Sequence, residues 1–277
     1  SALPMVMLKR DMECPYRLAA IDLDGTLFDH DKTVSAENLA ALRRLEAAGI
    51  EVVIATGRHR SRIRGALAHL PHTRWAITSQ GAAVLDLDTD VVVDAIYLAD
   101  EETRMLMELG DELGFTPLIY DDIDVRATRH DAGTDLYARI VGGIPSLLTT
   151  AELAAPRAHK VVWVGAAEDV SRLPSHPVVR ELALYHVQSL PGMYEFLPPD
   201  VTKGAGVAAL AKRLGVSAAE VVAFGDADND IPMFEWAGAS FAMPHGTPGS
   251  IAAAKSVASE GPPGSAFARA VEALRLD

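Results

Sequence analysis

The chain has 277 residues, of which 49% are hydrophobic and 23% are charged. These values are typical of a globular protein with one large or two modest domains and a sizeable core. The formal net charge of −13 at pH 7 disfavours a nucleic-acid backbone or an anionic membrane as a partner. The sequence contains no run of about 18 apolar residues, so it predicts no membrane span.

The N-terminal segment, residues 1–15, is predicted to be a tail outside the folded domains. Its short apolar stretch precedes Lys9 and Arg10, which is the wrong charge order for a secretory signal peptide. The single cysteine, Cys14, has no partner for an internal disulfide, and this fits a reducing compartment. We therefore expect a cytoplasmic protein.

Strand-like apolar runs alternate with amphipathic helical stretches from residue 18 to residue 79. Ser35 is a suitable N-cap for the first helix, and Gly49 is a suitable stop. This alternation predicts an α/β fold with a doubly wound parallel sheet. The predicted strands are 18–23, 50–55 and 75–79, and the predicted helices are 35–48 and 61–70.

The pattern changes after about residue 82. Strand-like runs and one long helix then follow in mixed order, which predicts an inserted α+β unit. The α/β rhythm resumes near Lys203, and a turn at Gly261 precedes the last helix. We expect residues 16–83 and 192–277 to form the core and residues 84–191 to form a second domain. The predicted elements are strands at 82–87, 91–94, 115–120, 160–164 and 221–224 and helices at 100–113, 203–214 and 230–236.

Aspartates follow two of the predicted strands directly. Asp22 and Asp24 come after the first strand, and Asp226, Asp228 and Asp230 come after the strand at 221–224. Open α/β sheets bind ligands beyond the carboxyl ends of their strands. Carboxylates about 4 Å apart repel by about 4 kcal/mol at an effective dielectric of about 20, and a bound cation relieves this repulsion. Hard oxygen ligands without a His or Cys cluster favour Mg²⁺, which also binds substrate phosphate oxygens.

Two other ligand-binding motifs, a calcium loop and a dinucleotide fingerprint, match parts of the sequence. The residues around each match rule the motif out. A calcium loop that starts at Asp22 requires a Gly and a Glu at the positions of Leu27 and Thr33. Residues 204–209 fit a dinucleotide fingerprint, with Asp226 about 20 residues later. However, two prolines precede this segment where a central strand is required. An NAD-dependent enzyme is therefore disfavoured.

Four segments occur together in an order that is far more specific than any one of them alone. They are Asp22-Leu23-Asp24-Gly25-Thr26, Ile54-Ala55-Thr56-Gly57-Arg58, Lys203-Gly204 and Gly225-Asp226-Ala227-Asp228-Asn229-Asp230. On these segments the sequence resembles a haloacid dehalogenase superfamily phosphatase of the Cof-like branch. The resemblance implies a Rossmann-like core with an α+β cap domain over the active site. The long interval between Thr56 and Lys203 is the expected place of the cap, with hinges near 84–87 and 190–192.

The predicted catalytic residues are Asp22, Asp24 and Lys203. Asp22 is the first residue after its strand and is the predicted nucleophile, which forms an aspartyl-phosphate. The resemblance gives Asp24 the acid/base role, in which it protonates the leaving alcohol and then activates water. Lys203 begins a helix, so its ammonium group and the helix dipole act at one point. We expect it to offset phosphate charge and to orient Asp22.

Other residues of the four segments are predicted to bind phosphate. The resemblance implies that the Thr56 hydroxyl and the backbone N–H groups near Gly57 hold phosphoryl oxygens, together with Lys203. Gly57 also permits a tight turn and a close approach of the backbone to a ligand. The amide of Asn229 would hydrogen-bond the phosphoryl group. Arg58 either neutralises substrate charge or is an exposed arginine at a helix start.

For the metal, the resemblance implies three ligands. They are the Asp22 carboxylate, the backbone carbonyl of Asp24 and the Asp226 carboxylate. Asp230 would stand behind them and hold Lys203 or a metal-bound water. Asp228, in the same segment, is expected to face solvent.

The inserted unit gives weaker signals. Tyr137, Arg139, His159 and Lys160 are candidates for substrate contact, although residues of these types more often pack or face solvent.

Two segments depart from the pattern of the resembled family. Gln80 stands where its members commonly carry Asn before Gly-Ala, and residues 243–246 replace a usual Gly-Asn-Ala turn. We expect neither departure to affect the chemistry of hydrolysis.

The predicted function is Mg²⁺-dependent hydrolysis of small phosphate monoesters, either sugar phosphates or a phosphorylated cofactor, by an aspartyl-phosphate enzyme. The partner is thus a small phosphorylated metabolite. One alternative is a phosphosugar mutase of the same superfamily, which returns the phosphoryl group to its substrate. An alternative of another class is a non-catalytic module that binds a phosphorylated ligand. The sequence makes no prediction of the oligomeric state.

Overall fold

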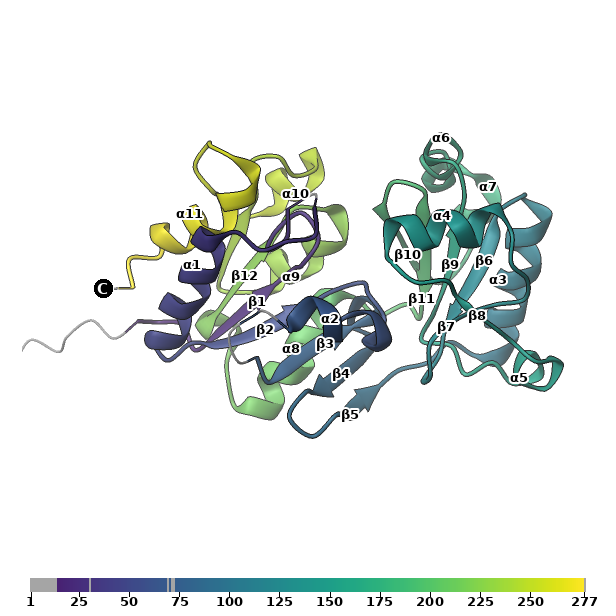
Figure 1. Ribbon diagram of the computed structural model, residues 1–277, viewed down its shortest axis with the longest axis horizontal. Helices are drawn as coiled ribbons and strands as arrows, with labels where there is room; N and C mark the ends of the chain where they lie inside the picture. The colour runs from purple at the N-terminus through teal and green to yellow at the C-terminus, as the bar shows by residue number, and fades with distance from the viewer. Residues whose placement is uncertain (1–13, 30, 69, 71–72, 277) are drawn as a thin grey trace, which may run out of the picture.

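The computed structural model describes residues 14–29, 31–68, 70 and 73–276. These residues form two domains, each built around its own β-sheet (Figure 1). All but the last two residues of the predicted tail at 1–15 lie outside the described part of the chain. Cys14 is a free, partly buried thiol.

The core domain contains an eight-stranded sheet with the order β14-β13-β12-β1-β2-β3-β4-β5. The strands from β14 to β3 are parallel, and β4 and β5 extend the sheet as an antiparallel hairpin. The predicted doubly wound α/β fold is therefore confirmed. The strands are β1 (Leu18–Ile21), β2 (Glu51–Ala55), β3 (Trp75–Thr78), β4 (Ala83–Asp86), β5 (Val91–Ala95), β12 (Val221–Gly225), β13 (Ala239–Ala242) and β14 (Ser256–Val257).

Helices cover both faces of the core sheet. They are α1 (Ala36–Ala47), α2 (Arg64–Leu67), α8 (Lys203–Leu214), α9 (Ile231–Trp236), α10 (Pro248–Ala253) and α11 (Ala266–Ala273). Alternate residues of a strand point to opposite faces. Ile21 of β1 therefore packs in the cluster formed with α1 and α11, whereas Ala20 packs in the cluster formed with α8 and α9. The helix predicted at 61–70 is shorter than expected, because a 3₁₀ turn at Arg60–Arg62 precedes α2.

The cap domain contains a six-stranded sheet with the order β10-β11-β9-β6-β7-β8. Its neighbouring strands are antiparallel except β7 and β8. The strands are β6 (Thr116–Tyr120), β7 (Val125–Ala127), β8 (Ser146–Leu147), β9 (Lys160–Val164), β10 (Tyr185–Leu190) and β11 (Met193–Leu197), and the helices are α3 (Asp100–Glu112), α4 (Ala132–Ile140), α5 (Thr150–Ala154), α6 (Ala167–Val170) and α7 (Pro177–Arg180). Leu106 of α3 packs on one face of this sheet and Tyr137 of α4 on the other.

The predicted domain boundaries at 84 and 191 do not match the pairing of the strands. The hairpin of β4 and β5 pairs with β3 of the core sheet, whereas β11 pairs with β9 of the cap sheet. The chain crosses to the cap at Tyr97, since the Ile96 amide donates to Ala82 of the core and the Leu98 amide donates to Ala158 of the cap. It returns between β11 and α8. The hinges predicted at 84–87 and 190–192 therefore lie within paired hairpins, because a strand's sequence does not reveal which sheet edge it joins.

Candidate active site

Three neighbouring strands of the core sheet end at the same edge. The strands are β12, β1 and β2, and their parallel pairing brings Asp226, Asp22 and Thr56 together just past their carboxyl ends. The Asp22 amide still pairs with the Phe224 carbonyl at 3.0 Å, so the backbone that carries this carboxylate is fixed by the sheet. This is the edge at which open α/β sheets bind ligands.

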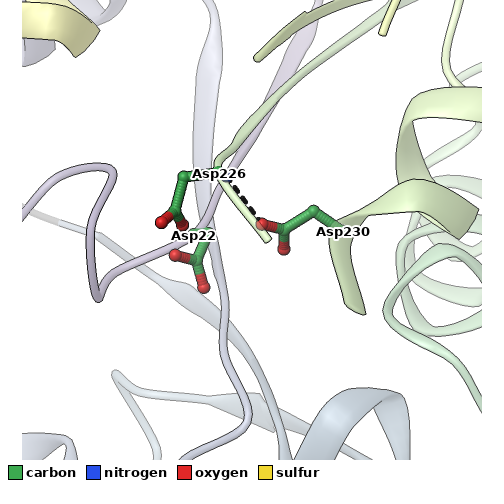
Figure 2. Close-up of side chains that lie close together, drawn as sticks. All are labelled: Asp22, Asp226 and Asp230. Carbon is green, nitrogen blue, oxygen red and sulfur yellow. Dashed lines mark hydrogen bonds between the residues drawn. The ribbon is translucent and has the colours of Figure 1, made fainter. Parts of the chain in front are cut away.

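Asp22, Asp226 and Asp230 form an acidic cluster at this edge (Figure 2). Each offers one carboxylate oxygen, and these oxygens all lie within 4.8 Å of one another. Asp230 is held in place, because its Oδ2 accepts hydrogen bonds from the backbone amides of Asp226 at 2.9 Å and Ala227 at 3.0 Å. Among the described residues the cluster has the hard oxygen ligands and the spacing that a divalent cation requires.

Lys203 lies between two members of this cluster. Its Nζ donates to Asp22 Oδ1 and to Asp230 Oδ1, both at 2.6 Å. It is the first residue of α8, which Thr202 caps by accepting the Ala205 amide at 3.0 Å. Burial opposes the charge of Lys203, but the two carboxylates outweigh it and raise the pKa of the ammonium group. Lys203 is therefore a permanent cation directly beside Asp22.

One lysine does not balance the three carboxylates, of which Asp22 and Asp230 are buried and Asp226 is partly buried. Burial raises the pKa of Asp22 well above its ordinary value, and the effect exceeds the opposing attraction of Lys203. Burial, with the nearby charge of Asp230, also raises the pKa of Asp226 to about 7. Thr26 supplies only one long hydrogen bond to Asp226, at 3.3 Å. The cluster thus has an excess of negative charge, which a bound cation would stabilise.

Asp24 does not join the cluster through its side chain. Arg58 holds its carboxylate in a two-pronged ion pair, with Nε donating to Oδ2 at 2.7 Å and Nη2 donating to Oδ1 at 2.5 Å. Arg58 is only 8% exposed, which removes the expectation of an exposed arginine. Burial disfavours its charge, but the bonds and charge of Asp24 raise its pKa overall. Such pairing fixes both the position and the orientation of Asp24.

Two glycines allow the segments of the site to approach closely. Gly25 has a φ of 89°, and a Cβ there would lie 2.3 Å from Asp226 Oδ2. A Cβ on Gly57 would lie 2.5 Å from Gln80 Nε2. The Thr56 hydroxyl accepts the backbone amide of Arg58 at 3.2 Å, so the turn after β2 is closed on itself. A larger residue at either glycine would therefore have to displace the Asp226 or the Gln80 side chain.

Asn229 reaches the same place from the turn after β12. Its Nδ2 donates to Gln80 Oε1 at 3.1 Å, and both side chains are buried. The sequence singled out Asn229 but not this partner. The sequence feature that could have pointed to Gln80 is that it replaces the Asn that members of the resembled family commonly carry.

The model of the haloacid dehalogenase-like hydrolases matches residues 19–262 of this chain. The chain belongs to this family. It is 31% identical over 254 residues to the Bacillus subtilis (strain 168) protein named "Putative phosphatase YxeH", which covers 86% of this chain and 91% of that relative. The predicted membership is confirmed, and with it the prediction that the chain is an enzyme of the hydrolase class.

Solved structures of the haloacid dehalogenase (HAD) superfamily share the fold over nearly the whole chain. BT1666 from Bacteroides thetaiotaomicron matches with a TM-score of 0.80 and 23% identity, covering 99% of this chain and 100% of its own. The HAD subclass IIB sugar phosphatase BT4131 matches with a TM-score of 0.80 and 20% identity, covering 94% and 100%. At these identities the likeness concerns the two-domain architecture of the family.

A pocket lies between the two domains, and each domain supplies one wall. The core wall, as we call it, consists of Asp22, Asp24, Thr56, Gly57, Arg58, Gln80, Asp226, Ala227 and Asn229, and the cap wall consists of Tyr120, Ile140, Val141, Ser189, Leu190, Met193 and Glu195. Every predicted catalytic, phosphate-binding or metal residue except Lys203 and Asp230 lines the core wall. These two are joined to the wall through hydrogen bonds, because Lys203 donates to both Asp22 and Asp230.

The four cap residues singled out in the sequence do not line this pocket. Tyr137 lies behind it and shares a hydrogen bond of 3.0 Å with the Tyr120 hydroxyl. His159 stacks on Tyr97, and Arg139 is exposed. Lys160 is buried, and its Nζ donates to Glu195 Oε2 at 2.5 Å and to the Gly57 carbonyl at 2.8 Å.

Lys160 therefore connects the two walls rather than facing the space between them. The sequence did not reveal the cap wall, because apolar residues that line a pocket have the same sequence pattern as apolar residues of a core.

In the described part of the chain no helix has the length and apolar character needed to cross a bilayer.

Proposed function

We propose that this member of the haloacid dehalogenase-like family is a Mg²⁺-dependent phosphatase. It hydrolyses small phosphate monoesters, either sugar phosphates or a phosphorylated cofactor, through a phosphorylated Asp22. The observation that carries the proposal is the placement of Asp22 at the pocket, with Lys203 at 2.6 Å and Asp226 and Asp230 beside it. The names of the relatives, a phosphatase and a sugar phosphatase, support the reaction class.

The residues present fit a magnesium ion. Asp22 and Asp226, with the backbone carbonyl of Asp24, would hold it, and Asp230 would support them through Lys203 and the Asp226 amide. The fit rests on the excess negative charge of the cluster and on its exclusively oxygen donors. When bound, the ion would offset the charges of the phosphoryl group and of the carboxylates that must approach it.

The first half of the reaction transfers the phosphoryl group to the protein. A carboxylate oxygen of Asp22 attacks phosphorus, and the bond between phosphorus and the ester oxygen breaks as the new bond forms. Asp24 has to leave its ion pair with Arg58 and bind a proton before this step, because a carboxylate paired with an arginine is ionised. It then gives this proton to the departing oxygen, which leaves as a neutral alcohol. Lys203 attracts the group toward Asp22.

The second half restores the enzyme. Asp24 now takes a proton from a water molecule, whose oxygen attacks phosphorus and releases Asp22 and inorganic phosphate. The Thr56 hydroxyl, the backbone at Gly57 and the second N–H of the Asn229 amide hold the phosphoryl oxygens during both steps. Closure of the cap wall over the pocket would exclude other water until the leaving group has gone.

The experiment measures inorganic phosphate released from a panel of monoesters with and without Mg²⁺. We expect Asp22→Asn to lower the rate by about 10⁴-fold or more, because the nucleophile is lost. Asp228→Asn is the matched control, since Asp228 belongs to the same segment but is exposed and bonded to Thr247. Wild-type activity in Asp22→Asn would contradict the mechanism. Isomer formation in place of phosphate release would identify a mutase, and binding without turnover would identify a binding module.

A further inference from the structure

Gln80 occupies an unfavourable backbone conformation. Ser79 and Gln80 have φ angles of 51° and 62°, in the left-handed region that residues with a Cβ rarely adopt. Two backbone hydrogen bonds hold the turn there, from the Ser79 amide to Arg58 at 3.0 Å and from the Gln80 amide to Thr56 at 3.2 Å. Such strain persists where the surrounding structure imposes it, and it clusters at functional sites.

The strained turn aims the Gln80 side chain at the pocket. The residue is only 1% exposed and yet belongs to the core wall. Its Oε1 accepts the Asn229 amide at 3.1 Å, which orients the side chain, whereas its Nε2 has no hydrogen-bond partner among the described residues. An amide nitrogen carries two N–H donors, and buried donors without partners are uncommon in proteins. The Nε2 group of Gln80 therefore offers hydrogen-bond donors that a ligand in the pocket could use.

We propose that Gln80 is a further substrate-binding residue, whose Nε2 donates to an oxygen of the transferring phosphoryl group. The inference rests on the proposed phosphatase function and adds a residue to its phosphate site. Nε2 lies over the Cα of Gly57, where a Cβ would be only 2.5 Å away. Gly57 and Asn229 both belong to the core wall, on which the proposed function places the phosphoryl oxygens. The leaving group faces the cap wall instead.

The first test measures the binding of inorganic phosphate, in the presence of Mg²⁺, by calorimetry. Gln80→Glu retains an acceptor for Asn229 but replaces the donor with a negative oxygen, so we expect phosphate affinity to fall about 10- to 100-fold. Gln80→Leu removes the donor, and also the acceptor of the Asn229 amide, without adding charge, and we expect a loss of about 10-fold or more. Gln188→Glu, the same change at a residue outside both walls, is the control and should stay within about twofold of wild type.

A second measurement separates binding from support of the fold. Gln80→Gly relieves the left-handed strain but also removes a buried side chain and the acceptor of the Asn229 amide, so the readout is the rise in unfolding temperature that saturating phosphate produces. This rise should be smaller than in the wild type, because phosphate affinity falls about 10-fold. A residue that only stabilised the turn and Asn229 would lower the unfolding temperature of the free protein and leave the phosphate-induced rise unchanged. That result would overturn the proposal.

A third measurement separates the phosphoryl group from the leaving group. With several esters, Gln80→Leu should lower kcat/KM by the same factor for each, because every ester presents the same phosphoryl oxygens. Losses that differ widely between esters, with phosphate affinity unchanged, would overturn the assignment. Wild-type protein that binds phosphate but hydrolyses no ester would instead refute the phosphatase function, while the loss of phosphate affinity in Gln80→Glu would still support the contact.

Discussion

The core wall and the cap wall of the pocket differ in how they handle charge. The core wall carries carboxylates that are paired with cations from other segments, as Lys203 is with Asp22 and Arg58 with Asp24. The cap wall is mainly apolar. Its one carboxylate, Glu195, is neutralised from behind by Lys160 and also accepts a hydrogen bond from Ser189.

The difference indicates a division of labour. Charged groups held in fixed positions suit a reaction in which charge moves between a phosphoryl group, a nucleophile and a proton donor. An apolar wall with few polar groups suits the recognition of the remainder of a small ligand. Changes to the core wall should therefore alter the chemical step for every substrate, whereas changes to the cap wall or to its support should alter binding and stability.

The largest expected effect concerns Asp24, the proposed proton donor of the core wall. Asp24→Asn should lower the turnover of alkyl phosphates by about 10²- to 10⁴-fold. In the first half of the reaction, the release of the leaving group, the loss should be much smaller for an aryl phosphate such as 4-nitrophenyl phosphate, whose leaving group needs no proton. Rapid-mixing rates of leaving-group release for the two ester classes check this prediction, because the later attack of water needs Asp24 with every ester; Met193→Ala in the cap wall is the comparison. Equal losses of this first rate for both classes in Asp24→Asn would contradict the assigned role.

The next effect concerns the support of the cap wall. Lys160 and Glu195 are both buried, so Lys160→Met leaves an unpaired buried carboxylate and should cost about 3–5 kcal/mol of unfolding free energy. The double variant Lys160→Met with Glu195→Gln removes that charge and should recover most of the loss. Urea unfolding at neutral pH measures both. A double variant as unstable as the single variant would show that the lysine acts by another route.

A third effect concerns pH and the contact between the domains. His59, in the turn after β2, donates from Nε2 to the Asp121 carbonyl of the cap at 2.7 Å. Burial lowers its pKa to about 4, against about 6.5 in the unfolded chain. As the pH falls from 6.5 toward 4, the unfolded chain binds a proton that the folded chain does not bind. Stability should therefore fall by about 3 kcal/mol over this range through His59 alone.

Stability measured against pH checks this expectation. His59→Asn should flatten the acid slope relative to wild type. His159 and His186, whose pKa values burial also lowers, remain in that variant and contribute to the residual slope. An unchanged slope in His59→Asn would contradict the prediction.

The smallest effect compares the two domains directly. Gly215 follows α8 in the core with a φ of 66°, Gly114 follows α3 in the cap with a φ of 83°, and a Cβ at either position meets no atom within 4 Å. Either change to Ala should therefore cost about 1 kcal/mol through backbone strain alone. Since the domains have separate hydrophobic clusters, we expect each substitution to shift a different calorimetric transition. One transition that both variants shift equally would show a single cooperative unit.

Much of the core domain was predictable because its signals are local. The apolar runs that form β1, β2 and β12 end at acidic or hydroxyl residues, and parallel strands must bring these ends to one edge. The same reasoning placed Lys203 at a helix start beside Asp22. The structure shows in addition that these charged side chains are buried together, so the charge of each one affects the others.

The domain boundaries were not predictable in the same way. The hairpin of β4 and β5 and the strand β11 were expected in the wrong domains, because backbone hydrogen bonds look the same in either sheet. Which strands these elements pair with depends on which hydrophobic face of each sheet the rest of the fold can cover. This is a property of the whole folded molecule and not of one segment.

The sequence by itself determined the family, the doubly wound core and the segments that form the candidate site, since these depend on residue type and order along the chain. Only the tertiary structure decided that Arg58 clamps Asp24, that Lys160 neutralises Glu195 behind the cap wall, and that Gln80 turns an unpaired donor toward the pocket. The physical reason is distance: an ion pair or a hydrogen bond forms only between atoms that folding brings within about 3 Å. No local pattern specifies which distant residues will meet.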